Sequence, residues 1–468
     1  MNTSEQAPES LLSGSGLPSV LGLPEDIMSM IIVDFLYEPG EDHHISITHT
    51  CQALRNLSLC HPQLWSHLSS QMPRHQVLTF LGRSRDVNLT IRLLKYERGG
   101  RKWWDFLRII KPFSRRWRSL DFDPNGEHMG RRFFTRLSLE LRGIELPYLN
   151  SLNVVIPRSY RWPQTEKDRR HDLPNFFSSW ILPRLRILTI SDIIPTHQNL
   201  FESITVLQLV MQDMVHRRWT VMEVYTLLSQ MTRLRLLQLH FWDLCGDPES
   251  NGTAFPLLQF NSMSFLSVIA AKTRNQKGQD IHRLLQCMRM PNLQTYICTA
   301  LPQRFVQGSR ADMSMFRHIF PRSDTFGYLR QLFVFTLGES SEPFPIEWIL
   351  GNLPCLDSIT IFSKHMAQSF ELSSGAACIP PRLRVMRFMR CNGLKLKFLR
   401  DLADALWGSP WRELHFEKLE FSGCEGIPRE DLESLLPEGK VVLTDCMFAV
   451  DQLIGYVHSG FFTVYLVG

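Results

Sequence analysis

The chain has 468 residues, of which 44% are hydrophobic and 21% are charged. This composition is typical of a soluble globular protein and excludes a mostly disordered, collagen-like or coiled-coil chain. The 51 basic and 46 acidic residues leave a formal charge of +5, which over this length does not by itself indicate a nucleic-acid or membrane partner. The length predicts about three domains, or one repetitive body with a small appendage.

The ten cysteines are sparse, and no two form a C-x-x-C pair. They predict reduced thiols in a cytosolic or nuclear protein rather than a disulfide scaffold. Residues 1–16 contain no basic run and no apolar core, so they do not resemble a signal peptide. Two uncharged stretches, 255–271 and 452–468, are each about 17 residues long, and we expect buried strands or helices there rather than membrane anchors.

Residues 1–20 are rich in Ser, Gly, Pro and Glu and are expected to form a disordered tail. An apolar segment follows at 21–70. Pro24 stands where the first turn of a helix tolerates proline, and the two acidic residues after it suit the positive end of the helix dipole. We expect this helix to end near Leu36, before Pro39.

This first helix is apolar around almost its whole circumference. The side chains responsible are Ile27, Met28, Met30, Ile31, Ile32, Val33, Phe35 and Leu36. A second helix is predicted from Ile47, Cys51, Leu54 and Leu57, and a third short element carries Leu64, Trp65 and Leu68. A module this small cannot bury so much apolar surface internally, so part of it is predicted to contact another chain.

Short motifs occur in a fixed order along the same segment. They are Leu23-Pro24, Asp26-Ile27, Ile31-Ile32, His49-Thr50-Cys51 followed by Leu54-Arg55, and Pro62-Gln63-Leu64-Trp65. This series resembles an F-box, in the form found in large fungal, basidiomycete-type families. The sequence differs from the family pattern at Leu54, where an aromatic residue is usual, and at Ile32, where Phe is usual. The match covers about a tenth of the chain.

The resemblance implies a non-catalytic role. F-box proteins are substrate receptors of Skp–cullin–F-box (SCF) ubiquitin ligases. Their F-box binds a Skp-family adaptor and, through it, a cullin–RING ligase, while the rest of the chain holds a protein substrate. By motif position, the residues expected to contact the adaptor are Leu23, Pro24, Ile27, Ile31, Leu54, Leu64 and Trp65.

A different pattern, apolar-x-x-apolar-x-apolar, recurs from residue 117 onward. It begins at Trp117, Phe134, Leu149, Leu185, Ile204, Leu234, Phe260, Leu293, Leu329, Leu356, Leu383 and Phe416. The mean step of about 27 residues lies within the period of leucine-rich repeats. The steps vary and the usual Asn is mostly missing, so the resemblance is to degenerate repeats, with an ordinary α/β domain as the alternative.

The predicted fold class is therefore an α/β repeat. A small N-terminal three-helix F-box module (21–70) and a junction (71–116) precede an irregular leucine-rich-repeat solenoid (117–468), a horseshoe with parallel strands on its concave face. Within the junction, 87–91 is expected to be a strand and 103–110 a helix. Polar interruptions at 158–172, 245–253, 272–280 and 363–377 are expected to be loops, and the outward-facing strand positions form the candidate substrate surface.

Residues 83–118 contain twelve Lys or Arg residues against three acidic ones, with Trp103, Trp104 and Trp117 among them. Such a segment suits phosphates and stacked bases. It equally suits a solvated face whose indoles lie in the core, or a patch that receives an acidic substrate segment. The sequence leaves these three interpretations open.

Motifs that would indicate an enzyme are absent from the sequence. There is no G-x-x-x-x-G-K-[ST], G-x-G-x-x-G or G-x-S-x-G. The histidines between 42 and 49 lack the spacing of metal ligands. We therefore predict no catalytic residues, cofactor or metal. Two other functions stay open: a repeat scaffold whose F-box no longer engages a ligase, and a nucleic-acid-binding protein that uses residues 83–118.

Overall fold

The computed structural model describes residues 23–24, 26–28, 30–31, 49–94, 101–123, 131–154, 180–191, 201–211, 219–241, 244–245, 255–271, 279–301, 319–320, 326–336, 344, 346–363, 379–391, 394–408, 415–424, 430 and 440–444. The chain forms two compact units, residues 1–121 and 122–468. The predicted tail at 1–20 lies outside the described residues, as do most of the four predicted loops.

The first unit begins with the expected helix. Residues 26–28 and 30–31 are helical, and the Met28 amide donates to the Pro24 carbonyl at 3.0 Å. The predicted end near Leu36 lies outside the described residues. The second predicted helix is confirmed as α3 (Gln52–Cys60), with Cys51 as its N-cap. The Cys51 Sγ accepts a hydrogen bond from the Leu54 amide at 3.5 Å.

The predicted third element of the module, which carries Leu64, Trp65 and Leu68, is helical only in its first half, so the prediction of a third helix is wrong for Leu68. A 3₁₀ turn, η2, covers Pro62–Trp65, but Leu68 lies on a strand, β1 (His67–Ser69). Leu68 is buried between two half-buried neighbours, which is the period of a strand and not of a helix. β1 pairs in parallel with β2 (Leu89–Leu94).

Strands and helices alternate through the whole of the predicted junction. After β1 come α4 (Arg74–Arg83), β2, α5 (Arg101–Ile110), η3 (Lys111–Arg116) and β3 (Trp117–Asp123). The strand predicted at 87–91 and the helix predicted at 103–110 are confirmed as β2 and α5. The strand order is β1-β2-β3. Repeating architecture therefore starts about fifty residues earlier than the sequence pattern indicated.

The second unit is built on a long sheet whose strands follow one another in chain order. They are β4 (Ser151–Val154), β5 (Ile187–Ser191), β6 (Val206–Met211), β8 (Leu236–Phe241), β11 (Phe265–Ala271), β13 (Thr295–Leu301), β14 (Gln331–Thr336), β15 (Ser358–Ser363), β16 (Val385–Met389), β17 (Lys418–Ser422) and β18 (Val441–Thr444). Every neighbouring pair is parallel. This α/β arrangement is consistent with a leucine-rich-repeat-like protein.

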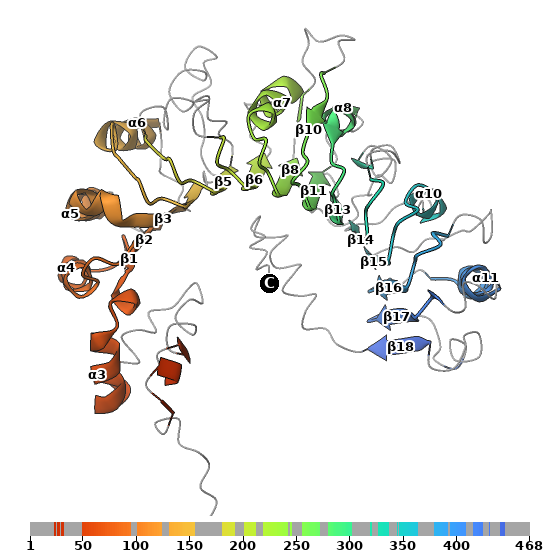
Figure 1. Ribbon diagram of the computed structural model, residues 1–468, viewed down its shortest axis with the longest axis horizontal. Coiled ribbons are helices and arrows are strands. Elements are labelled where there is room, and N and C mark those ends of the chain that lie inside the picture. Colours follow the sequence, from red (N-terminus) through yellow and green to blue (C-terminus); the bar gives the residue numbers. More distant parts are fainter. Residues whose placement is uncertain are drawn as a thin grey trace, which may run out of the picture. The chain divides into compact units, whose positions relative to one another are not determined.

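Helices connect several of these strands on one side of the sheet. They are α6 (Arg131–Glu140), α7 (Val221–Ser229), α8 (Gln279–Gln286), α10 (Ile346–Gly351) and α11 (Leu396–Trp407). Within this unit, α7, α8, α10 and α11 lie along the outer side of the curve that the strands follow (Figure 1). Two short parallel pairs, β7 (Trp219–Thr220) with β9 (Leu244–Cys245) and β10 (Leu258–Gln259) with β12 (Met288–Arg289), lie apart from the long sheet.

Two rows of apolar side chains form the core of the second unit. The second residues of successive strands pair across the sheet, and each is at most 1% exposed: Leu207, Leu237, Leu266, Tyr296, Leu332, Ile359, Met386 and Leu419. The fourth residues, Leu209, Leu239, Val268, Cys298, Val334, Ile361, Phe388 and Phe421, are at most 3% exposed. These rows are the predicted repeat positions, and their register explains why the pattern recurs.

Each strand of the long sheet from β4 to β16 is preceded by a turn with an apolar residue at both ends. In one turn the Leu234 amide donates to the Met231 carbonyl, and in the next the Met263 amide donates to Phe260. The true repeat thus has four apolar positions, spaced three, three and two. The pattern predicted at Phe260, Met263 and Phe265 began one turn too early, because Leu266, not Phe265, pairs with Leu237 in the core.

The fragment predicted as a strand at Phe134, Leu137 and Leu139 is part of helix α6. Leu137 is buried and Leu139 is 63% exposed. An apolar residue every three positions fits a helix as well as the first half of the repeat, so the pattern alone did not separate the two.

Two cysteines occupy the repeat position at which Asn or Cys is usual, three residues after the last apolar strand position. The Cys391 Sγ donates to the Ile361 carbonyl at 3.5 Å, and the Cys424 Sγ donates to Phe388 at 3.3 Å. Each thiol therefore bonds the backbone of the preceding repeat. Both cysteines are free, as predicted.

In the part of the chain that the structure describes, no helix is long and apolar enough to cross a membrane. The uncharged stretch 255–271 contains β10 and β11, which confirms buried strands there. The second uncharged stretch, 452–468, lies outside the described residues.

Candidate protein-interaction surfaces

A row of exposed apolar side chains lies along the first helix of the N-terminal unit and begins just before it. Leu23 is 39% exposed, Ile27 42%, Met30 67% and Ile31 47%. Met30 and Ile31 are three and four residues after Ile27, which places these three on one face of the helix, and Leu23 lies in the bend just before the helix. Met28, in contrast, is 7% exposed and faces inward. We call Leu23, Ile27, Met30 and Ile31 the apolar ridge. Met30 was not among the predicted contacts, although its place in the helix adds it to this row.

The predicted adaptor-contact residues fall into three groups in the structure. Leu23, Pro24, Ile27 and Ile31 are exposed, and Leu54 is half-buried. In contrast, Leu64 is 4% exposed and Trp65 is 2% exposed. Of the predicted contact residues, only the exposed group, Leu23, Pro24, Ile27 and Ile31, therefore presents a substantial surface to a partner.

Trp65 has partners within its own unit. Its Nε1 donates to the Ser58 carbonyl at 2.9 Å, and its ring meets Phe80 edge to face with 5.0 Å between centroids. The Arg83 guanidinium lies 4.4 Å from the ring centroid. Trp65 therefore joins η2 to α3 and to α4 and is a packing residue of this unit rather than a free contact.

The basic segment 83–118 has its indoles in the core. Trp103 and Trp117 are 0% exposed, and Trp104 is 9% exposed. Arg116 bonds the backbone, with its Nε donating to the Val87 carbonyl at 3.0 Å and its second guanidinium nitrogen to the Ser84 hydroxyl at 2.8 Å. Buried indoles present no ring face for stacking bases, so this geometry favours the packing interpretation of the segment.

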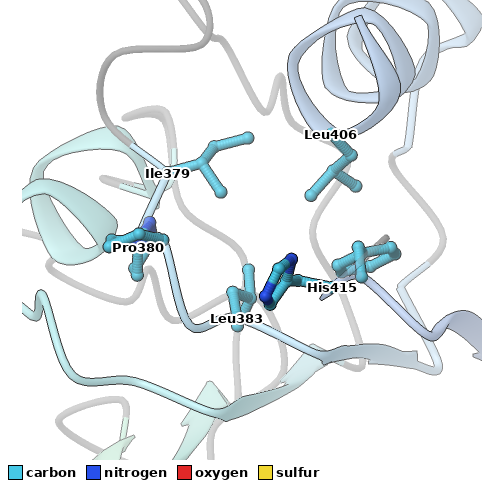
Figure 2. Close-up of a pocket in the computed structure, with 7 residues that line it drawn as sticks. Ile379, Pro380, Leu383, Leu406 and His415 are labelled. Carbon is cyan, nitrogen blue, oxygen red and sulfur yellow. The ribbon is translucent and has the colours of Figure 1, made fainter. Parts of the chain in front are cut away.

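Small-molecule and metal sites are not evident among the described residues. No group of three or more His, Cys, Asp or Glu side chains there could hold a metal ion. His49 is exposed, and the rest of the predicted histidine cluster lies outside the described residues. A shallow depression with a cavity volume of only about 10 Å³ lies between α11 and the turns before β16 and β17 (Figure 2). It is lined mainly by apolar residues of the repeat packing and is smaller than most ligand sites.

The second unit has a sheet face that points away from its helices. The first, third and fifth residues of strands β4 to β17 form it, because successive side chains of a strand alternate between faces. We call this the concave face. It is the set of outward positions predicted to bind substrate. From β4 to β15 it contains no Asp, Glu, Lys or Arg.

Charged residues appear on the concave face only at its C-terminal end, on β16 and β17. Arg387 and Lys418 both pair with Glu420. Burial raises the pKa of Glu420, but the hydrogen bonds from Lys418 and Arg387 outweigh this, so the pKa lies below its usual value. The concave face is therefore divided into a long uncharged part and a short ionic end.

His240 lies within the uncharged part and is 2% exposed. Burial lowers its pKa from 6.5 to about 4, because the imidazolium form loses its hydration. Its lateral neighbours in register are Val210 and Ile269, which offer the charged form no compensation.

We expect this histidine to make the second unit less stable in acid. Between pH 6.5 and 4 the unfolded chain binds a proton that the folded chain does not, so stability is complete above pH 6.5 and is lost as the pH falls toward 4. The loss at pH 5 relative to pH 7.5 should be about 2 kcal/mol from this group. Hydrogen exchange of the β8 amides at both pH values, with each rate divided by the intrinsic exchange rate at that pH, measures it. His240→Gln should reduce the pH dependence by that amount, and an unchanged slope would contradict the assignment.

Comparison of the sequence with models of protein families finds no match. Comparison with curated proteins likewise finds no significant relative. Functional inference for this chain therefore rests on its own residues and geometry.

Proposed function

We propose that this chain is the substrate-recognition subunit of an SCF-type ubiquitin ligase. In this proposal the apolar ridge and the adjoining helices bind a Skp-family adaptor, and the repeat unit binds the protein substrate. The chain supplies no catalytic group. Its contribution is to hold substrate lysines near the ligase, which raises their effective concentration.

The apolar ridge carries the proposal. Three large apolar side chains lie on one face of a helix and a fourth, Leu23, lies just before it, and each is more than a third exposed. Exposed apolar rows of this kind are typical of protein-binding sites, because water contact with them is unfavourable. The ridge also coincides with the opening motif of the F-box resemblance, Leu23-Pro24 followed by Ile27 and Ile31.

The test is adaptor binding by the full chain with charges placed in the ridge. Ile27→Asp combined with Ile31→Asp should weaken binding to a purified Skp-family adaptor at least 100-fold, or about 2.7 kcal/mol. The reason is that two carboxylates would be desolvated without partners at the interface. Both side chains are exposed in the free chain, so its folding should not change. Isothermal titration calorimetry measures the dissociation constant.

A matched control is available in the same unit. Leu78 on α4 is 50% exposed and lies outside the F-box motifs. Leu78→Asp should leave adaptor affinity within about twofold of the unsubstituted chain. Equal binding by the ridge variant and the control would exclude the ridge as the contact.

The scaffold alternative makes the opposite prediction for the unsubstituted chain. The two departures from the F-box pattern, at Ile32 and Leu54, motivate this alternative. If the unsubstituted chain binds no adaptor while remaining folded, the ligase proposal fails, and a repeat scaffold becomes the better description.

A further inference from the structure

Two thiols of the second unit stand at equivalent places in neighbouring repeats. Strands β16 and β17 lie side by side (Figure 1), and their register pairs the last residue of one with the last residue of the other. Cys391 and Cys424 each follow two residues after the end of their strand. The residue before each cysteine has a positive φ, 52° at Arg390 and 59° at Gly423, so the backbone leaves both strands by the same turn. The two cysteines are therefore one strand spacing apart.

That spacing suits a disulfide. Neighbouring strands lie about 4.8 Å apart, and the Cα atoms of disulfide-bonded cysteines are usually about 4.4–6.8 Å apart. Both side chains also turn the same way, because each Sγ approaches the carbonyl of the fourth residue of the preceding strand, Cys391 at Ile361 (3.5 Å) and Cys424 at Phe388 (3.3 Å). The two thiols hydrogen-bond to each other as well. No large backbone movement is therefore needed to join them.

The environments of the two thiols differ in a way that assigns them different roles. Cys391 is 0% exposed, and burial raises its pKa well above the usual value. Cys424 is half-buried beside the exposed Gly423, which has no side chain to shield it. A hydrogen bond from the Cys391 thiol lowers the pKa of Cys424 and outweighs the effect of burial. Because the thiolate is the nucleophile, Cys424 is the thiol that reacts first.

Other buried cysteines of the same unit behave differently. Burial raises the pKa of Cys287 to about 12 and that of Cys298 well above its usual value. Buried thiols of this kind are inert structural groups. Proximity to a second thiol thus distinguishes Cys424 from these two cysteines.

We propose that Cys391 and Cys424 are an oxidative modification site, at which a peroxide converts the two thiols into a reversible disulfide. A peroxide is the class of oxidant that fits, because a small neutral molecule can reach a half-buried thiol. Disulfides of proteins in reducing compartments are usually transient ones of this kind. The inference does not depend on the ligase proposal, because the apolar ridge belongs to the other unit.

The chemistry has two steps. The Cys424 thiolate attacks one oxygen of hydrogen peroxide, so that an S–O bond forms, the O–O bond breaks and hydroxide leaves. The product is a sulfenic acid, whose sulfur has lost the two electrons that the peroxide gained. The Cys391 sulfur then attacks the Cys424 sulfur. An S–S bond forms, the S–O bond breaks, and the oxygen leaves as water with the proton of the Cys391 thiol.

The disulfide would join the two strands that form the ionic end of the concave face. Arg387 on β16 pairs with Glu420 on β17, and each lies four residues before its cysteine. A covalent link between the strand ends restricts the local opening in which these strands separate. Oxidation should therefore stabilise the ionic end.

Peroxide treatment of the full chain tests the proposal. The reduced chain is freed of reductant and treated with a small excess of hydrogen peroxide, and the remaining thiols are blocked with N-ethylmaleimide. Mass spectrometry of the unreduced digest should find the peptide containing residue 391 joined to the peptide containing residue 424, in at least tenfold excess over any other linked pair. Dithiothreitol should restore both thiols. A different dominant pair, disulfide-linked dimers, or both thiols still blocked after Cys60 is oxidised would overturn the proposal.

Two matched serine variants test the order of the steps. In Cys391→Ser the hydroxyl retains a donor for the Ile361 carbonyl but cannot form the disulfide, so oxidation should stop at the sulfenic acid and dimedone should label position 424. In Cys424→Ser the remaining thiol is buried, and dimedone labelling at position 391 should be at least tenfold lower. Equal labelling of the two variants, or labelling of neither, would overturn the assigned roles.

Hydrogen exchange tests the structural consequence in the unsubstituted chain. The β17 amides should exchange at least tenfold more slowly in the oxidised chain than in the reduced chain, whereas the β6 amides should exchange equally fast in both. Unchanged exchange in β17 would overturn the stabilising role of the disulfide. Adaptor binding should be the same in both forms, so a failure here and a failure of the ligase proposal are distinguishable.

Discussion

Replacement of Trp65 by Ala is expected to destabilise the N-terminal unit by about 3–5 kcal/mol. The substitution removes a fully buried indole, its hydrogen bond to Ser58 and its edge-to-face contact with Phe80. Because the chain has two units, a single unfolding free energy is not well defined. Hydrogen exchange of the β2 amides should therefore be used, and it should accelerate more than 100-fold.

A conservative variant separates packing from hydrogen bonding at this site. Trp65→Phe retains an aromatic ring beside Phe80 and loses the Nε1 donor, so it should cost about 1–3 kcal/mol. If the β2 amides exchanged equally fast in the two variants, packing of the indole would not be the main contribution of Trp65 to the stability of the N-terminal unit. Loss of adaptor binding in Trp65→Ala would follow from unfolding, whereas the ridge variant tests contact directly.

Replacement of Tyr296 by Ala should have the largest effect in the second unit, again about 3–5 kcal/mol. Its side chain is 0% exposed in the middle of the core row, and its ring lies 5.1 Å from Phe326 and 5.5 Å from Phe320. The hydroxyl donates to the Ile319 carbonyl at 2.6 Å. Hydrogen exchange of the β11 and β14 amides measures the loss.

The matched variant Tyr296→Phe retains the ring contacts. It leaves the buried Ile319 carbonyl without this donor, so a cost of about 1–2 kcal/mol is expected. A cost as large as that of the Ala variant would mean that the hydrogen bond, and not packing, dominates at this position.

The repeating part of the fold could be predicted because the residues of its core rows recur at the same spacing in each repeat of the sequence. Leu207 and Leu209, for example, keep the same phase as Leu237 and Leu239, and each pair lies in register. The errors arose where one pattern fits two structures. The spacing of Phe134, Leu137 and Leu139 fits both a repeat strand and a helix, and in the structure it belongs to helix α6. Phe260 fits the first apolar position of the predicted pattern, but in the structure it begins the turn before the strand.

The candidate surfaces were less accessible to sequence reasoning, because exposure depends on contacts distant in the chain. Trp65 and Ile27 both belong to motifs of the F-box resemblance. Only the structure separates a buried side chain that contacts α4 from an exposed one. Likewise, outward strand positions were expected to be free, but Thr299 and Phe362 are buried. Strand β18 was not predicted, since its short run lacks the leading apolar residue of the repeat.

Strand order in the second unit also bears on how such a chain can evolve in length. Along the long sheet each strand pairs only with the strand before it and the strand after it. Deleting or duplicating one complete step would therefore join strands that already share the same hydrogen-bonding register and core rows. A gene for a chain with this strand order can therefore gain or lose whole repeats, because the remaining strands keep the same core rows.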